Sequence, residues 1–186
     1  KHLVLVQLLQ HLNQKEKGYR VIDTHAGAGA YRVGGASQQQ EWVDGVGRLW
    51  PAPADAPPGV AAYLEQVKAV NGAGALRMLP GSPLIVQHQM RAQDELHAFE
   101  LHPTDLRQLE KLMDGLKGIH VHLGDGYPGL PPLLPPPTRR GLILIDPPYE
   151  LKADYARVLA TVRTVLQKFP DAVLAVWVPQ LQRLEA

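Results

Sequence analysis

The strongest indication of the fold is the stretch Gly141-Leu142-Ile143-Leu144-Ile145-Asp146-Pro147-Pro148-Tyr149. Its first five residues form a continuous apolar run, which is typical of a parallel strand that is buried on both faces. Open α/β sheets bind their ligands beyond the carboxyl ends of such strands. The polar residues that follow the run are therefore expected at a ligand site.

The loop after this predicted strand is stiff and rich in hydrogen-bond acceptors. Pro147 and Pro148 fix two φ angles and lack backbone N–H groups, which leaves acceptor carbonyls in a rigid loop. Asp146 adds a carboxylate, and Tyr149 adds an aromatic ring. This combination suits a flat substrate with an exocyclic NH2 group, such as a nucleobase. The alternative is a proline-stiffened turn between a strand and a helix, without chemistry.

Strands and helices alternate along the chain. Five strands are predicted, at residues 19–23, 95–101, 119–123, 141–145 and 172–178. Apolar residues at helical spacing predict helices at residues 3–13, 82–91, 104–114 and 154–168, with Ser82 as the N-cap of the second. This alternation indicates βαβ units, so the predicted fold class is α/β with a mainly parallel sheet.

An additional helical stretch separates the first two predicted strands. The apolar residues from Trp42 to Trp50 predict one helix and those from Val60 to Val67 another, which Asn71-Gly72 ends. Because this stretch interrupts the βαβ pattern, residues 36–80 are predicted to form an inserted helical subdomain. Its tryptophans are expected in its core.

A glycine-rich loop, Thr24-His25-Ala26-Gly27-Ala28-Gly29, follows the first predicted strand. Gly27 and Gly29 allow a tight turn and a close approach of the backbone to a ligand. The dinucleotide-binding fingerprint has a third glycine where Arg32 stands, which argues against a nicotinamide enzyme. S-Adenosylmethionine (SAM) has no phosphate groups and needs only the close approach of the backbone, so it remains a candidate cofactor.

Acidic residues follow the next two predicted strands. Glu100 ends the second strand, where a carboxylate can accept hydrogen bonds from both hydroxyls of a ribose. Asp125, followed by Gly126, comes after the third strand and can accept a hydrogen bond from an adenine amino group. Taken singly, Glu100 could be a solvated charge and Asp125 part of a Gly-Asp-Gly turn. Together with Asp146 they predict a cofactor site along one edge of the sheet.

The composition fits a single globular domain. The chain has 186 residues, 45% of them hydrophobic and 20% charged, and no apolar run approaches the roughly 18 residues that span a bilayer. The absence of cysteine excludes disulfides and thiolate metal sites and fits a cytoplasmic protein. With a net charge of only +1, a nucleic-acid partner would be held by local basic patches. Because the chain starts at Lys1, we expect one domain, residues 1–186, that is truncated at both ends.

Longer motifs in the chain resemble those of one family. They are Asp23-Thr24-His25-Ala26-Gly27-Ala28-Gly29, Pro80-Gly81-Ser82-Pro83, Glu100-Leu101-His102-Pro103 and Arg139 to Glu150. These motifs are similar to those of the ribosomal RNA large subunit methyltransferase J family, which belongs to the Rossmann-like class I SAM-dependent methyltransferases with a D/N-P-P-Y/F/W motif. The resemblance runs from Lys1 to about Pro179.

The resemblance implies an enzyme that uses SAM, without a metal, to methylate N6 of an adenine in 23S ribosomal RNA. It implies no membrane and no obligatory protein partner. It implies that SAM is bound by His2, His25, Ser82, Glu100, Asp125 and Gly126, and that Asp146 is catalytic. The predicted cofactor site also includes Gly27 and Gly29 of the glycine loop and Asp146, and the predicted catalytic residues are Asp146, Pro147 and Tyr149.

In the expected mechanism, the Asp146 carboxylate and the Pro147 carbonyl accept hydrogen bonds from the two N–H groups of N6. They thereby stabilise the positive charge that develops on the attacking nitrogen. Tyr149 is expected to stack on the base. Four basic residues are expected to flank the mouth of the pocket and to hold RNA phosphates: Arg32, Arg139, Arg140 and Lys152.

Three other functions remain open on the sequence alone. The Asp-Pro-Pro-Tyr motif does not distinguish a methyltransferase of RNA adenine from one that acts on DNA adenine or on guanine N2. A second alternative is a non-catalytic RNA-binding module on a relict SAM fold, which SAM binding would test. The third is a nicotinamide oxidoreductase, which Arg32 and the Pro-Pro-Tyr turn disfavour.

Overall fold

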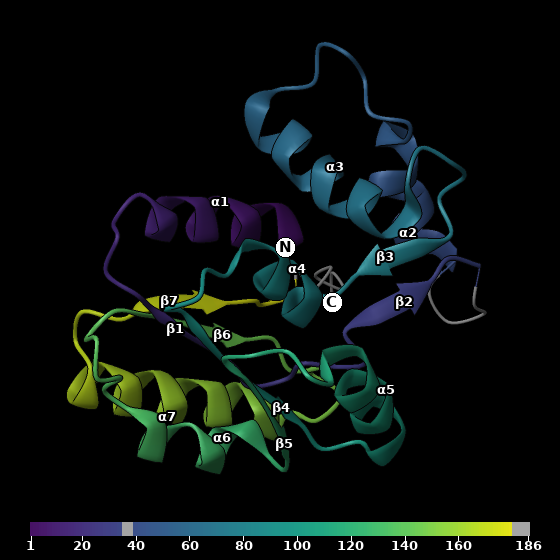
Figure 1. Cartoon of the computed structure of the whole chain (residues 1–186). Helices are drawn as coiled ribbons and strands as arrows, with labels where there is room; N and C mark the ends of the chain where they lie inside the picture. Colours follow the sequence, from purple (N-terminus) through teal and green to yellow (C-terminus); the bar gives the residue numbers. More distant parts are fainter. Residues whose placement is uncertain (35–38, 180–186) are drawn as a thin grey trace, which may run out of the picture.

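A five-stranded parallel sheet organises the protein (Figure 1). The computed structural model describes residues 1–34 and 39–179. The strands are β1 (Arg20–Asp23), β4 (Glu95–Glu100), β5 (Ile119–Leu123), β6 (Gly141–Ile145) and β7 (Val173–Val176). They lie in the order β5-β4-β1-β6-β7, and each pairing is parallel. All five strands were predicted, and their bounds differ from the prediction by at most two residues at either end.

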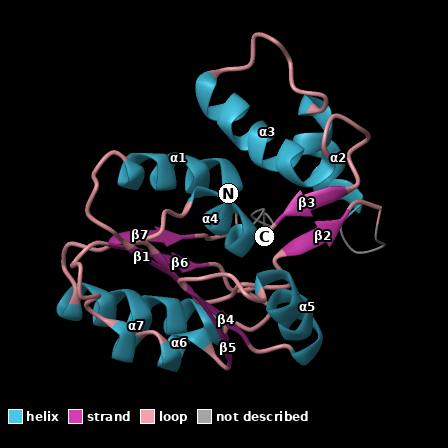
Figure 2. Cartoon of the chain, in the orientation of Figure 1, coloured by secondary structure: helices cyan, strands magenta, loops and turns pink. Residues whose placement is uncertain are grey.

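Helices cover both faces of the sheet, as Figure 2 shows. One face carries α1 (His2–Asn13), α4 (Ser82–Gln89) and α5 (Pro103–Met113). The other face carries the short α6 (Gly126–Gly129), the 3-10 helix η2 (Pro131–Leu133) and α7 (Ala153–Lys168). A parallel sheet needs such cover on both faces because its strands alternate apolar side chains to either side. The predicted α/β class with a mainly parallel sheet is confirmed.

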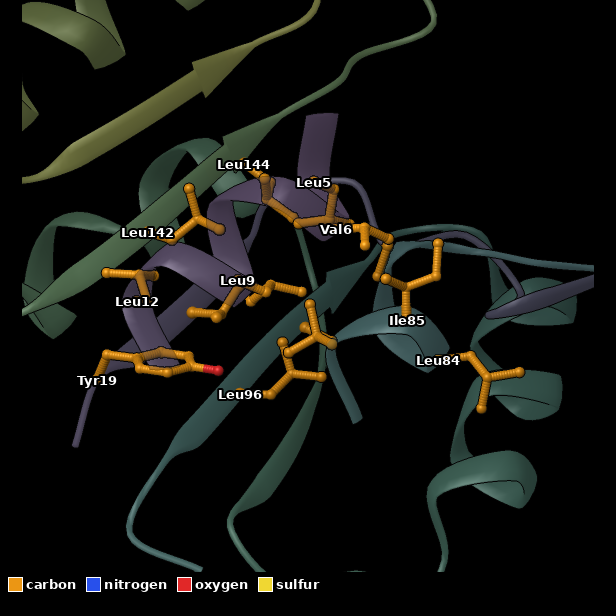
Figure 3. Close-up of a cluster of buried hydrophobic side chains, with 14 of the residues drawn as sticks. Leu5, Val6, Leu9, Leu12, Tyr19, Leu84, Ile85, Leu96, Leu142 and Leu144 are labelled. Carbon is orange, nitrogen blue, oxygen red and sulfur yellow. The ribbon is translucent and has the colours of Figure 1, made fainter. Parts of the chain in front are cut away.

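The alternation along the strands divides the core into two layers. Leu142 and Leu144 of β6 belong to the layer under α1 and α4, whereas Ile143 and Ile145 belong to the layer under α7. Figure 3 shows the first layer, in which Leu5 and Leu9 of α1 approach the sheet beside Ile85 and Leu96. The fully apolar run that predicted β6 is thus explained by burial on both sides.

The helical insertion between β1 and β4 is also confirmed, and its base is a two-stranded antiparallel ribbon that the sequence did not reveal. The ribbon consists of β2 (Ala30–Arg32) and β3 (Met78–Pro80). Between them lie α2 (Gln39–Asp44), the 3-10 helix η1 (Val46–Leu49) and α3 (Pro58–Asn71), which ends at Gly72 with φ 66° as predicted. The N–H of Gly81 donates to the carbonyl of Gly29 at 2.8 Å, so the ribbon brings the start of α4 back to the glycine loop.

The insertion has a small core of its own. Val46, Leu64 and Val67 are buried there, and Trp42 and Trp50 pack against them. Residues 36–38, with which the predicted subdomain begins, lie outside the described residues, as do residues 180–186.

Two predicted helix bounds were wrong. The expected single helix from Trp42 to Trp50 is interrupted at Gly45, which adopts φ −102° and ψ −111°, outside the helical region. The N-cap of α4 is Gly81, and Ser82 is the first helical residue instead. The Ser82 hydroxyl does not cap the helix because it donates its hydrogen bond to the carboxylate of Asp23 on β1.

Within residues 1–34 and 39–179, no helix combines the length and the apolar character that crossing a membrane requires.

Candidate active site

The acidic residues predicted at one edge of the sheet do lie together. Asp23 ends β1, Glu100 ends β4, Asp125 follows β5 and Asp146 follows β6. Because parallel strands end at the same edge, Glu100, Asp125 and Asp146 line one cavity of about 650 Å³. We call it the carboxylate cavity. Six acidic residues line it: Glu100, Asp105, Asp125, Asp146, Glu150 and Asp154. The Lys and Arg side chains in its lining are Lys1 and Arg157.

Asp146 faces the cavity and not the interior, since its side chain is 29% exposed. Its Oδ2 accepts a hydrogen bond from Nζ of Lys1 at 2.5 Å. Lys1 and Asp146 also line two further cavities, of about 360 and 460 Å³. Asp146 is therefore the point at which three cavities meet.

Glu100 joins the end of β4 to the glycine loop. Its Oε2 accepts from the N–H of Gly27 at 2.8 Å, and its Oε1 accepts from the N–H of His102 at 2.6 Å. A carboxylate oxygen has more than one lone pair, so Glu100 keeps acceptor capacity toward the cavity. Both bonds fix the orientation of the carboxylate.

Glycine is required at two positions of the cavity wall. At Gly27, with φ 64°, a Cβ atom would lie 2.0 Å from the hydroxyl of Tyr31. At Gly126 it would lie 2.2 Å from the carbonyl oxygen of Thr24. At Gly126 the close atom belongs to the backbone, and at Gly27 the positive φ disfavours any side chain, so a larger residue at either position would disrupt the wall. These glycines let backbone segments from β1 and β5 close on one ligand space.

Ser82 is bound to the acidic residue that ends β1. The hydroxyl of Ser82 donates to Oδ2 of Asp23 at 2.6 Å, and the N–H of His25 donates to Oδ1 at 3.2 Å. Asp23 is 1% exposed, and its burial raises the pKa of the carboxyl to about 6. Since the Ser82 proton is directed to Asp23, the lone pairs of Ser82 Oγ remain for a donor in the smaller cavities that it lines.

Burial favours the neutral form of the two histidines of the predicted site. Burial, with a smaller contribution from the charge of Lys1, lowers the pKa of His2 to about 3. Burial also lowers the pKa of His25, whose ring lies edge-on to Tyr127 with the centroids 4.9 Å apart. The neutral ring of His2 has one donor and one acceptor nitrogen. In His25, Nδ1 lies 2.8 Å from Oγ1 of Thr24, whose proton is donated to the carbonyl of Leu144, so Nδ1 carries the ring proton and Nε2 is the acceptor that remains for a ligand.

The predicted site residues are therefore divided among the cavities. His25, Gly27, Glu100, Asp125, Gly126, Asp146 and Pro147 line the carboxylate cavity. His2 and Ser82 line the other two, and His25 lines the 460 Å³ cavity as well. Gly29 faces α5 instead, where a Cβ atom would meet Leu112 at 2.8 Å. Lys1 and Asp146, which line all three cavities, connect the cavities of His2 with that of Glu100.

Tyr149 does not point into the carboxylate cavity. Its hydroxyl donates to the carbonyl of Trp177 at 2.7 Å, and its ring packs against Tyr155 with the centroids 4.7 Å apart. The residue has φ 55°, in the left-handed region, which turns the chain after the two prolines. A stacking role for Tyr149 would require this contact with Trp177 to open.

The expected position of two arginines was wrong. Arg139 and Arg140 directly precede β6, whereas Asp146 directly follows it. The five residues of β6 separate them from the site by roughly 16 Å at about 3.3 Å per residue. Arg140 donates to the carbonyls of Lys17 and Leu12 at the amino edge of the sheet. Lys152, at the N-cap of α7, and Arg32, on β2, are exposed.

Two residues of the site were not predicted from the sequence. Lys1 reaches Asp146 from the start of α1, and Arg157 reaches Asp125 from the second turn of α7. Neither belongs to a local motif. The position of α7 could have indicated Arg157. This helix begins just after the Asp-Pro-Pro-Tyr loop, so its first turns lie at the same edge of the sheet.

No group of three or more histidine, cysteine, aspartate or glutamate side chains in residues 1–34 and 39–179 is arranged to hold a metal ion.

Comparisons with known proteins identify relatives over nearly the whole chain. The protein is 40% identical over 185 residues to the ribosomal RNA large subunit methyltransferase J of Escherichia coli (strain K12), and 39% identical over 186 residues to that of Haemophilus influenzae. Each match covers 98% of this chain and 66% of the relative. The chain thus spans about two thirds of the length of these curated relatives.

A solved structure agrees with the fold. The crystal structure of protein LPL1258 from Legionella pneumophila superposes with a TM-score of 0.90 at 35% identity, over 98% of this chain and 67% of that one. The family model described as "Ribosomal RNA large subunit methyltransferase D, RlmJ" matches residues 16–186. The chain therefore belongs to the RlmJ family of ribosomal RNA large subunit methyltransferases.

Proposed function

We propose that the protein transfers a methyl group from SAM to N6 of an adenine in 23S ribosomal RNA. The observation that carries this proposal is the position of Asp146. It stands beside Pro147 in an acidic cavity with Glu100 and Asp125, and it also lines the cavities that His2 and Ser82 line.

The carboxylate cavity fits a cationic nucleoside. Six carboxylates and two cationic side chains line it, although the whole chain has a net charge of +1. A cleft lined mainly by one sign of charge concentrates ligands of the opposite sign. SAM carries a sulfonium ion, and it supplies an activated methyl group when it is bound. Glu100 has acceptor capacity for ribose hydroxyls, and Asp125 for an adenine amino group.

Asp146 and Pro147 would activate the acceptor amine. An adenine N6 is a poor nucleophile because its lone pair is delocalised into the ring. The Asp146 carboxylate and the Pro147 carbonyl would each accept a hydrogen bond from one N–H of this amine. These bonds would favour a tetrahedral nitrogen and stabilise the positive charge that develops on it. Lys1 Nζ already donates to Asp146 Oδ2, so the amine would bind at Oδ1 or share Oδ2 with Lys1. The site would otherwise act by holding the two reactants in line.

The base must leave its stack to reach Asp146, because the residue lies in a cavity and not on a flat surface. Single-stranded or flipped adenine is therefore the expected acceptor. Since Tyr149 packs against Tyr155, its stacking on the base would require a rearrangement of the loop.

Methylation of purified RNA with labelled SAM tests the proposal. The RNA is taken from cells that lack the gene, and the products are digested to nucleosides. We expect label in N6-methyladenosine and none in matched DNA oligonucleotides. Label in N2-methylguanosine or in DNA would support the other amine substrates instead. SAM binding without methylation of any nucleic acid would support a non-catalytic module.

A further inference from the structure

Asp125 has a partner on each carboxylate oxygen. Its Oδ1 accepts from the N–H of Tyr127 at 3.0 Å, which makes Asp125 the N-cap of α6. Its Oδ2 accepts from Nη2 of Arg157, on α7. The carboxylate is thus held from two different elements, and the remaining lone pairs are directed by these two bonds.

Arg157 is itself held at two points. Besides its ion pair with Asp125, its guanidinium carbon lies 4.2 Å from the centroid of the Tyr127 ring. Tyr127 is buried and in turn contacts His25. A planar guanidinium that stacks on a ring and pairs with a carboxylate has a defined orientation, unlike a lysine ammonium. Arg157, Asp125 and Tyr127 all line the carboxylate cavity.

The arrangement determines what Asp125 can recognise. The guanidinium N–H on Oδ2 and the backbone N–H on Oδ1 fix the orientation of the carboxylate and so the direction of its remaining lone pairs. An ionised carboxylate has acceptors and no donor, so Asp125 acts as an acceptor of fixed direction toward the cavity. An acceptor matches an exocyclic NH2 group and is repelled by a carbonyl oxygen. A 6-oxo purine would therefore lose a hydrogen bond at Asp125 and gain a repulsion between two acceptors.

We propose that Arg157 is a positioning residue that makes Asp125 select a 6-amino purine over a 6-oxo purine in the nucleoside part of the cofactor. This inference rests on the proposed function, since it assumes that the adenosine end of the cofactor lies at Asp125. Arg157 acts through Asp125 and not through contact with the reacting atoms.

The simplest alternative is an ordinary surface ion pair. The side chains of Arg157 and Asp125 are 44% and 30% exposed, and pairs of this kind contribute about 0–1 kcal/mol to stability. A purely structural pair would change the affinities of amino and oxo ligands by the same factor. The ratio of the two affinities therefore separates the two roles.

Calorimetric titration with S-adenosylhomocysteine and with its 6-oxo analogue, S-inosylhomocysteine, tests the inference. We expect the wild-type protein to prefer the adenosyl ligand by about 10- to 100-fold, the range for a hydrogen bond to a charged group. Arg157→Ala should lower this preference at least about fivefold, and Arg157→Lys should keep part of it. Asp125→Asn, whose side chain can also donate, should nearly abolish it.

Arg163→Ala is the matched control, because Arg163 is an exposed arginine further along α7. It should leave the preference unchanged. Thermal unfolding of each variant shows whether the fold is retained. An unchanged preference in Arg157→Ala, or equal weakening of both ligands, would overturn the inference and leave the proposed function standing. A wild-type protein that binds neither ligand would overturn both.

Discussion

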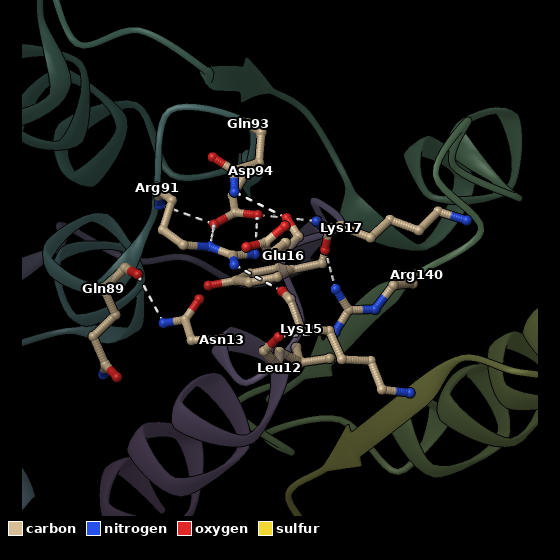
Figure 4. Close-up of polar contacts among 11 residues, drawn as sticks. Leu12, Asn13, Lys15, Glu16, Lys17, Gln89, Arg91, Gln93, Asp94 and Arg140 are labelled. Carbon is tan, nitrogen blue, oxygen red and sulfur yellow. Dashed lines mark hydrogen bonds and ion pairs between the residues drawn. The ribbon is translucent and has the colours of Figure 1, made fainter.

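The charged residues at the two ends of the parallel sheet differ in their access to a cavity. At the amino end, side chains pair with one another and with backbone carbonyls, as Figure 4 shows. Asp94 accepts from Nε and Nη2 of Arg91 and from the N–H of Tyr19, and Arg91 Nη1 donates to the carbonyl of Lys15. At the carboxyl end, Glu100, Asp125 and Asp146 instead line an open cavity.

The two ends differ because of the turns and loops that connect the strands and helices there. At the amino end, the turn from α1 to β1 leaves carbonyls such as Lys15 and Glu16 without partners in regular structure, and Arg91 and Gln93 satisfy them. Buried or crowded polar groups need such partners. At the carboxyl end, a cavity of about 650 Å³ separates the acidic side chains. Charge at the first end therefore serves stability, and charge at the second is available to a ligand.

The largest expected effect tests the carboxyl end. Asp146→Asn keeps the shape and one acceptor oxygen but removes the negative charge, so methyl transfer should fall about 10²- to 10³-fold, as when one group that stabilises transition-state charge is lost. Single-turnover methylation of RNA measures this. Asp171→Asn, an exposed acid after α7, is the control. A rate near that of the wild type would exclude an essential carboxylate.

The next effect tests the amino end. Asp94→Ala removes a fully buried carboxylate and leaves Arg91 and the N–H of Tyr19 without their acceptor. The free energy of unfolding should fall by about 3 kcal/mol, the lower part of the range for a broken buried pair. Urea denaturation measures it. Cofactor affinity in the folded variant should stay within about twofold of the wild-type value, because the cavity is at the other end of the strands.

Glu95→Gln is the matched control for Asp94→Ala. Glu95 is the next residue and pairs with Arg20, but its side chain is 42% exposed, so the loss should be below about 1 kcal/mol. Equal losses in the two variants would contradict the view that the buried pair stabilises this end.

The last prediction, an effect that is absent at neutral pH, concerns Asp23, the buried acid at the carboxyl end. Burial raises its pKa from 3.8 to about 6, so the folded protein binds the proton more tightly than the unfolded chain does. Stability should therefore rise as the pH falls through about 6 and level off near 4, by at most roughly 3 kcal/mol from a shift of this size.

Comparison with Asp23→Asn isolates the contribution of Asp23. The asparagine variant has no charge to bury, so the difference in unfolding free energy between wild type and variant should change between pH 4 and pH 6 and be constant above pH 7. If the unfolding free energies of wild type and variant changed in parallel with pH across this range, Asp23 would not titrate there.

Local patterns were sufficient for much of the fold. The apolar run Gly141–Ile145 predicted a doubly buried strand, and Ile119–Leu123 was also predicted with its exact bounds. Gly141–Ile145 is buried at all five positions, whereas in the edge strand Ile119–Leu123 the alternate residues Ile119 and Val121 pack against the core. Both patterns are local and can be recognised in the sequence. The ribbon of β2 and β3 was missed because each strand has three residues, too few to show a period. Its pairing joins residues that lie far apart in the chain.

The site was predictable to a similar extent. Glu100, Asp125 and Asp146 could be placed at one edge because each follows a predicted strand, and parallel strands end together. Arg140 was misplaced because its nearness to Asp146 in sequence says nothing about which end of β6 it occupies. Ser82 was interpreted as a helix cap because its actual partner, Asp23, belongs to a strand on the other side of the insertion.

By itself, the sequence determined the α/β class, the edge that carries the acidic residues and the resemblance to a methyltransferase family, since strand periodicity and short motifs are local properties. Only the tertiary structure decided that Lys1 pairs with Asp146, that Arg157 pairs with Asp125 and that Tyr149 turns toward Trp177. These contacts join different helices, strands and loops, and their geometry depends on how the helices pack against the sheet.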